Sequence, residues 1–251
     1  MSNKQLQTLL NQLLSSDKIK DYCPNGLQVE GKTEINKIVT GVTASEALID
    51  AAIDVQADAI LVHHGYFWKG ENQTITGLKK NRIGKLIKHD INLFAYHLPI
   101  DVHPELGNNA QLASLLGITN IEAIDQVSPL GVLMRGEFEQ ALTATQLTAS
   151  ITSTLHRAPL VSDARKQAIK TVAWCTGGGQ GYIDTAAELG IDAFITGEAS
   201  EQTIHSSREH GIDFFAAGHH ATERYGVKAV GEYLQQNHGL DVEFIDIPNP
   251  V

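Results

Sequence analysis

Histidines and carboxylates recur in three short motifs of this sequence, and together they offer a set of metal ligands. Two motifs place a histidine four residues before a carboxylate, as H-x-x-x-D and H-x-x-x-E. Residues i and i+4 lie on the same face of a helix, so each pair could form half of a metal site. The third motif is a pair of adjacent histidines followed by glycine. The residues concerned are His63 and His64, His97 and Asp101, and His219 and Glu223.

These donor types indicate which metals the site would take. Imidazole and carboxylate suit Zn, Mn, Fe, Co or Ni better than a metal that prefers soft ligands. Five or more ligands exceed what one tetrahedral ion needs, and they suit two ions about 3.5–4 Å apart. The alternative is that each motif is an ordinary surface feature, since a solvated i,i+4 pair contributes only about 0.3–0.5 kcal/mol.

The position of the motifs favours the metal hypothesis. Continuous apolar runs at Ile38–Val42, Ala59–Val62 and Leu93–Tyr96 predict buried strands, and Ser45–Val55 predicts a helix between the first two. Open α/β sheets bind ligands beyond the carboxyl ends of their strands, where all three histidine motifs fall. Neighbouring strand residues point to opposite faces. We therefore expect the strand to end before the adjacent histidines, with Gly65 allowing the turn.

An internal repeat organises the chain. The segment VTASEALIDAAIDVQADAILVHHG resembles CTGGGQGYIDTAAELGIDAFITGE, with Asp58 aligned to Asp192 at an offset of 134 residues. HDINLFAYHLPID likewise resembles HGIDFFAAGHHATE, in the same order. Two ordered matches indicate a duplication. The predicted fold is therefore α/β, with two pseudo-symmetric lobes and a dinuclear metal cleft between them. We expect residues 1–100 plus 222–251 in the first lobe and residues 101–221 in the second.

Several residues near the motifs admit two interpretations. Glu198 occupies the repeat position equivalent to the adjacent histidines, and it could act as a general base or cap the following helix. Gly177–Gly179 could cradle an anion or only allow tight packing. Trp68 could line a pocket, or lie in the core or a subunit interface. Cys175 ends an apolar strand and is interpreted as a core residue.

Composition excludes several classes of function. The 251 residues carry a net charge of −10, from 29 acidic and 19 basic side chains, and no window is strongly basic. A nucleic-acid partner is therefore not expected. The two cysteines form no disulfide framework. Polar residues interrupt the apolar N-terminus, and no apolar run reaches the roughly 18 residues of a membrane span. We expect a soluble, cytoplasmic protein.

Seven segments together resemble the family named for NGG-one-interacting factor three, whose bacterial members are named type 2 homologues of GTP cyclohydrolase I. The resemblance runs from about Asn25 to Val251. The segments are NGLQVEG, GVTASEALIDAA, ILVHHGYFW, AYHLPIDVHPELGNNAQLA, TGEASEQTIH, AAGHHATERYGVKA and FIDIPNPV.

This resemblance implies a dinuclear metal site and a toroidal homohexamer whose metals face an internal cavity. It places His97 beside the metals rather than on them. The ligands that it implies are His63, His64, Asp101, His219 and Glu223.

Two classes of function fit these observations. The first is a hydrolase of the GTP cyclohydrolase type, acting on a nucleotide-like small molecule through metal-bound water, with His97 or Glu198 moving protons. A dimetal phosphoesterase is a variant of this class. The second is a non-catalytic metal-binding scaffold or regulator that acts through its ring assembly. Open coordination positions at the metals would favour the enzyme, whereas a closed shell would favour the scaffold.

Overall fold

The computed structural model describes residues 1–251, and the chain divides into two compact units. Unit 1 comprises Met1–Ile100 and Gly226–Pro248, and unit 2 comprises Asp101–Tyr225 and Asn249–Val251. The predicted α/β class is confirmed, because each unit contains one sheet together with helices. None of the helices combines the length and apolar character that a bilayer span requires.

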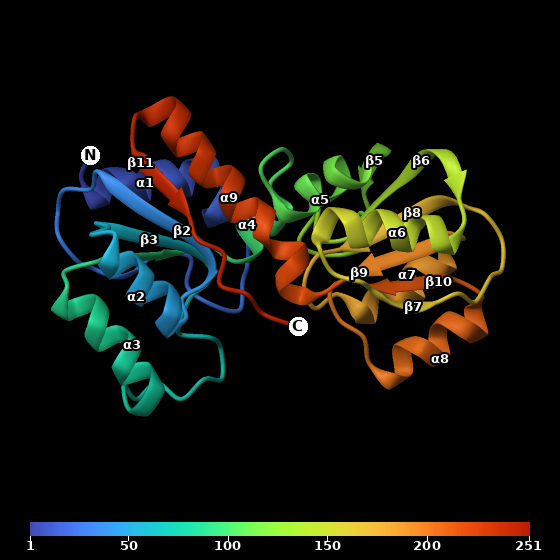
Figure 1. Cartoon of the computed structure of the whole chain (residues 1–251), viewed down its shortest axis with the longest axis horizontal. Coiled ribbons are helices and arrows are strands. Elements are labelled where there is room, and N and C mark those ends of the chain that lie inside the picture. The colour runs from blue at the N-terminus through green and yellow to red at the C-terminus, as the bar shows by residue number, and fades with distance from the viewer. The chain divides into compact units, whose positions relative to one another are not determined.

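Unit 1 contains a five-stranded sheet in the order β1-β4-β3-β2-β11. Figure 1 shows α2 and α3 on one face of this sheet and α1 with the later part of α9 on the other. The strands are β1 (Gly26–Val29), β2 (Lys37–Thr43), β3 (Ala59–His64), β4 (Asn92–Ala95) and β11 (Asp241–Phe244). The helices are α1 (Asn3–Leu13), η1 (Ser16–Lys18), α2 (Glu46–Asp54), α3 (Gly77–Lys88), most of α4 (Leu98–Val102) and most of α9 (His219–His238).

Unit 2 contains a six-stranded sheet in the order β5-β6-β8-β9-β10-β7. Helices α5 and α6 cover one face, and α7 and α8 cover the other (Figure 1). The strands are β5 (Ile118–Ala123), β6 (Met134–Leu142), β7 (Leu160–Ser162), β8 (Ile169–Cys175), β9 (Ala193–Thr196) and β10 (Asp213–Ala216). The helices are α5 (Asn108–Leu116), α6 (Ala144–Leu155), η2 (Gln180–Tyr182), α7 (Ile183–Glu188), α8 (Glu201–His210) and the first turns of α9.

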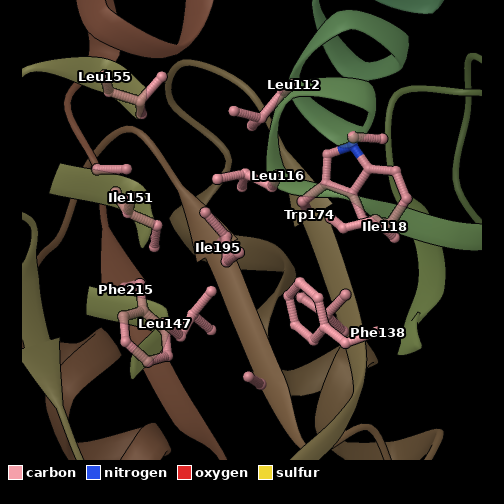
Figure 2. Close-up of a cluster of buried hydrophobic side chains, with 14 of the residues drawn as sticks. Leu112, Leu116, Ile118, Phe138, Leu147, Ile151, Leu155, Trp174, Ile195 and Phe215 are labelled. Carbon is pink, nitrogen blue, oxygen red and sulfur yellow. The ribbon is translucent and has the colours of Figure 1, made fainter. Parts of the chain in front are cut away.

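The core of unit 2 lies between its sheet and the α5–α6 layer. Figure 2 shows side chains from both helices meeting aromatic and branched side chains of the strands. Each fully buried side chain of this kind contributes about 1.5–3 kcal/mol to folding. The labelled residues are Leu112, Leu116, Ile118, Phe138, Leu147, Ile151, Leu155, Trp174, Ile195 and Phe215.

The central strands of the two sheets share one hydrogen-bonding register. Ile38 pairs with Ala59 between β2 and β3, and Val172 pairs with Ala193 between β8 and β9. Each residue of the second pair therefore lies 134 positions after its counterpart in the first pair. The β3–β4 and β9–β10 ladders also correspond, with β4 and β10 offset by 121 residues. An antiparallel strand forms the edge of each sheet next to these ladders: β1 pairs with β4, and β7 pairs with β10.

An aspartate ties together the starts of the parallel strands in each unit. In unit 1, Asp58 Oδ2 accepts the backbone N–H groups of Asn36 and Lys37, at 2.7 and 2.9 Å. In unit 2, Asp192 Oδ2 accepts the N–H groups of Lys170 and Thr171, at 2.8 and 2.9 Å. The carbonyl groups of Asp58 and Asp192 accept the first N–H of β4 and β10 respectively. The aligned aspartates therefore have the same structural role.

Helix boundaries and caps that the local sequence indicates agree with the structure. The predicted helix at Ser45–Val55 is α2, and Ser45 is its N-cap. Thr143 and Gln146 form a capping box at the start of α6. One expectation was wrong, because β3 does not end before the adjacent histidines. It continues to His64, which pairs with Thr43 of β2 after β4 has ended opposite Val62.

Candidate metal centre

Three histidines of unit 1 form a cluster at the carboxyl ends of β3 and β4. His63 is fully buried, whereas His64 and His97 are half-buried. The ring centroid of His63 lies 4.5 Å from that of His64 and 5.0 Å from that of His97. One potential ligand atom of each histidine lies within 4.8 Å of the others. The strand therefore allows the adjacent histidines to share a cluster without the predicted turn.

Each histidine of this cluster engages Nδ1 with an oxygen of the protein. The partner of His63 is the carbonyl oxygen of Tyr96 at 3.2 Å, and that of His64 is Thr43 Oγ1 at 3.2 Å. His97 Nδ1 lies 2.7 Å from Asp21 Oδ1. Metal-binding histidines in proteins show this pattern, because the bond at one nitrogen fixes the ring and leaves the other to bind. Nε2 is thus the nitrogen that each ring would offer to a metal.

In unit 2, the H-x-x-x-E motif lies on one helical turn, as predicted. His219 begins α9, and its Nε2 lies 3.1 Å from Glu223 Oε2. The Nδ1 of the same ring lies 2.6 Å from Glu198 Oε1. Burial by itself lowers the pKa of His219, but hydrogen bonds and attraction to Glu223 and Glu198 outweigh it and raise the pKa to about 9.

Asp101 lies in unit 2 near Glu223, and both carboxylates are buried. Its Oδ1 accepts from Asn108 Nδ2 at 2.8 Å and from Thr176 Oγ1 at 3.3 Å, which orients the carboxylate. An oxygen of Asp101 and one of Glu223 lie within 4.8 Å of each other. Burial and the charges of these two carboxylates raise the pKa of Cys175. This agrees with a core role for Cys175 rather than a nucleophilic one.

The glycine-rich loop packs against the ligands of unit 2. Gly177 adopts a positive φ of 66°, and a Cβ there would clash with Glu223 Oε1 and lie 3.2 Å from His219 Nε2. A Cβ at Gly179 would lie 2.6 Å from Cys175 Sγ. Both positions therefore require glycine for close packing. The structure supports the packing interpretation of this loop.

Neighbouring side chains include some that the sequence motifs missed. Asp21 lies outside the three histidine motifs, and nothing in the neighbouring sequence indicates its bond to a histidine 76 residues later. Glu198 is not the cap of α8, because Ser200 has that role. Trp68 lies beside the histidine cluster, with its ring centroid 4.8 Å from that of His97 in an edge-on arrangement.

The donor chemistry of the candidate ligands in both units fits divalent first-row metals. Unit 1 contributes imidazole nitrogens, and unit 2 contributes one imidazole and two buried carboxylates. Imidazole and carboxylate together suit Zn, Mn, Fe, Co and Ni. Oriented rings and hydrogen-bonded carboxylates are the usual surroundings of metal ligands. Both units therefore contribute predicted ligands, His63 and His64 from unit 1, and Asp101, His219 and Glu223 from unit 2.

Comparison with known proteins finds relatives along the whole chain. The model of the Duf34/NIF3 (NGG1p interacting factor 3) family matches residues 1–250. Proteins named GTP cyclohydrolase 1 type 2 homolog from Vibrio cholerae and Escherichia coli are 60% and 57% identical, with 100% of each chain covered. Among solved structures, protein ybgI of unknown function matches with a TM-score of 0.95 at 56% identity. TTHA1606 from Thermus thermophilus matches at 0.91 and 34%, and both matches cover all of each chain.

Proposed function

This chain belongs to the Duf34/NIF3 family, and from that premise we propose that it binds two divalent cations through ligands from both units and uses them in hydrolysis. The observation that carries the proposal is the hydrogen bonding of its histidines. In both units, the rings engage Nδ1 with a protein oxygen, so Nε2 is the nitrogen through which each ring would bind a metal. The proposed ligands are His63, His64, Asp101, His219 and Glu223.

The proposed substrate is a nucleotide-like small molecule. The names of the relatives point to GTP cyclohydrolase chemistry, in which water attacks C8 of the guanine ring and formate is lost. Bound divalent ions would supply a water whose pKa is lowered towards about 7. His97 can exchange a proton at Nε2, because Asp21 engages its Nδ1. Glu198 orients His219 through Nδ1, so we assign it a positioning role in place of the predicted general base.

The first test concerns the metal and separates ligands from neighbours. Glu223→Ala should remove at least one ion per chain, because Glu223 is a buried carboxylate beside His219 and Asp101. His97→Ala should retain the metal with an affinity about 10–100-fold lower, since it removes a neighbour rather than a ligand. Elemental analysis and titration with Zn²⁺, Mn²⁺, Fe²⁺, Co²⁺ and Ni²⁺ measure both, and circular dichroism confirms folding.

Two results would contradict this assignment. If His97→Ala loses metal as completely as Glu223→Ala, His97 is a ligand. If reconstituted wild-type protein binds no metal, the centre itself is wrong.

The second test concerns the reaction. The metal-loaded protein is incubated with GTP and with a panel of nucleotides and phosphoesters, and products are identified by mass spectrometry. Release of formate from GTP supports the cyclohydrolase reaction, and release of phosphate from the panel supports the phosphoesterase variant. Metal binding with no turnover in the panel favours the non-catalytic scaffold.

We also propose that the two units arose by internal duplication and that the protein forms a toroidal homohexamer. The duplication is supported by the shared ladder registers and by the equivalent bonds of Asp58 and Asp192. The ladders align β4 with β10 at an offset of 121, whereas the His97 and His219 motifs differ by 122. The two motifs therefore occupy neighbouring rather than identical positions of the repeat.

A further inference from the structure

We propose that Asp21 is a positioning residue that holds the His97 ring by Nδ1 and keeps Nε2 as its working nitrogen. This inference concerns the site of the proposed function and rests on it for its functional consequence. The side chain of Asp21 is only 2% exposed, and its Oδ1 lies 2.7 Å from His97 Nδ1. A carboxylate accepts but does not donate, so Nδ1 must carry the hydrogen. The bond therefore selects the form of the His97 ring in which Nδ1 carries the hydrogen.

Asp21 also fixes the backbone that carries this ring. Its Oδ2 accepts the N–H of Leu98, the first residue of α4, at 2.9 Å, and the side-chain amide of Asn25 at 2.9 Å. Asn25 Oδ1 in turn accepts the N–H of His97 at 2.8 Å. The segment 21–25 thus holds both the ring and the main chain of His97. Such double attachment is what keeps a proton-transferring group in register with its substrate.

The same residues could instead form a separate metal site, because Asp21, Cys23 and His97 bring three donor atoms within 4.8 Å of one another. The hydrogen bonds of Asp21 decide against it. Each carboxylate oxygen accepts two bonds: Oδ1 from Tyr22 N and His97 Nδ1, and Oδ2 from Asn25 Nδ2 and Leu98 N. A carboxylate has about four acceptor positions, so none remains for an ion.

Charge supports the same choice. Burial raises the pKa of the Asp21 carboxyl, but hydrogen bonds from His97 and Asn25 outweigh it and hold the pKa below the usual range. Asp21 is therefore ionised when it accepts from His97. Burial and the negative charge of Asp21 raise the pKa of Cys23 to about 12. This thiol therefore keeps its proton at neutral pH in the metal-free protein.

Trp68 provides a reporter that needs neither metal nor substrate. Its ring meets that of His97 edge-on at 4.8 Å, so a change in the position of His97 alters quenching of its fluorescence. The only other tryptophan, Trp174, is fully buried in the core of unit 2. A Trp68→Phe variant identifies which part of the emission belongs to Trp68.

The test is a double-mutant cycle with Asp21→Asn, His97→Ala and the combination. Asp17→Asn is the control, since it removes the same charge from the neighbouring η1 turn. We expect Asp21→Asn to change Trp68 emission in metal-free protein and to lower Zn²⁺ affinity about 10–100-fold. Both effects should disappear in the His97→Ala background. Asp21→Glu keeps the carboxylate, so it should restore part of the wild-type Trp68 emission and part of the Zn²⁺ affinity. It also serves as the second variant if Asp21→Asn does not fold.

The inference is overturned if Asp21→Asn changes emission and affinity equally with and without His97, or if it changes neither by more than Asp17→Asn does. The emission arm requires no bound ion and no turnover. If the protein shows no hydrolase activity, the emission measurement can therefore still confirm or exclude the positioning role of Asp21.

Discussion

A single histidine nitrogen binds a metal, and the bond at the other nitrogen decides which one is available. Here the partners are of several kinds: a carbonyl oxygen for His63, a hydroxyl for His64 and a carboxylate for His219. Residue type and spacing in the sequence could predict the rings themselves. The partners could not be predicted, because Tyr96 and Thr43 make these bonds only once the strands have paired.

Glycine at position 177 is required by the side chains that surround it. We expect Gly177→Ala to displace Glu223 and His219, because the added Cβ overlaps the position of Glu223 Oε1. Metal affinity should fall by at least about tenfold, the range seen when the surroundings of a ligand are altered. The positive φ adds about 1–2 kcal/mol of destabilisation. Calorimetric titration with Zn²⁺ measures the first effect, and urea unfolding measures the second.

Gly181→Ala is the matched control for that experiment. Gly181 lies just after this loop, in η2, but a Cβ there meets no atom within 4 Å, and its φ is not positive. It should change neither affinity nor stability appreciably. Equal losses in both variants would mean that loop flexibility, rather than contact with Glu223, matters at Gly177.

The pattern of apolar runs was enough to predict β2, β3, β4 and the helix between the first two, because those strands are buried on both faces. It was not enough for β1, β7 and β11. These short strands lie at sheet edges, and only pairing with a neighbour makes them strands.

Asp58 should make the stability of unit 1 depend on acid. Burial raises its pKa, but hydrogen bonds from Lys32 and from the backbone of Lys37 and Asn36 outweigh burial and leave the pKa below the usual value. A lowered folded-state pKa gives stability that is present above the unfolded pKa of about 4 and is lost as the pH falls through the folded value. Asp58→Asn should therefore cost about 1–2 kcal/mol at pH 7.

The measurement is urea unfolding of wild type and Asp58→Asn at a series of pH values. The difference in the free energy of unfolding between the two proteins should be largest at pH 7 and should shrink as the pH falls below about 4. Asp54→Asn, at the exposed end of α2, is the control and should show no such difference. A difference that is constant with pH would indicate a packing effect instead of an ionised carboxylate.

Assembly is the property of the whole molecule for which the sequence offered the least direct support. Tyr66, two residues before Trp68, is buried within unit 1, and its hydroxyl donates to the carbonyl oxygen of Ala44. Apolar side chains are exposed elsewhere, at Ile87, Leu130 and Leu160. We expect light scattering at micromolar concentration to give six times the chain mass of 27.2 kDa. A mass of one or two chains would contradict the proposed hexamer.

Metal should couple the stabilities of the two units if one dinuclear centre takes ligands from both. An ion that binds only the folded protein stabilises it by about 2.7 kcal/mol at 100 times its dissociation constant. Under the proposed arrangement, His63→Ala in unit 1 and Glu223→Ala in unit 2 should each abolish most of the metal-induced shift of the whole chain. Thermal unfolding with EDTA and with added Zn²⁺ measures that shift in wild type and in both variants. If each unit instead bound its own ion independently, either substitution would leave the other unit's shift intact. Two separately melting units, each responding only to its own substitution, would therefore rule out a shared centre.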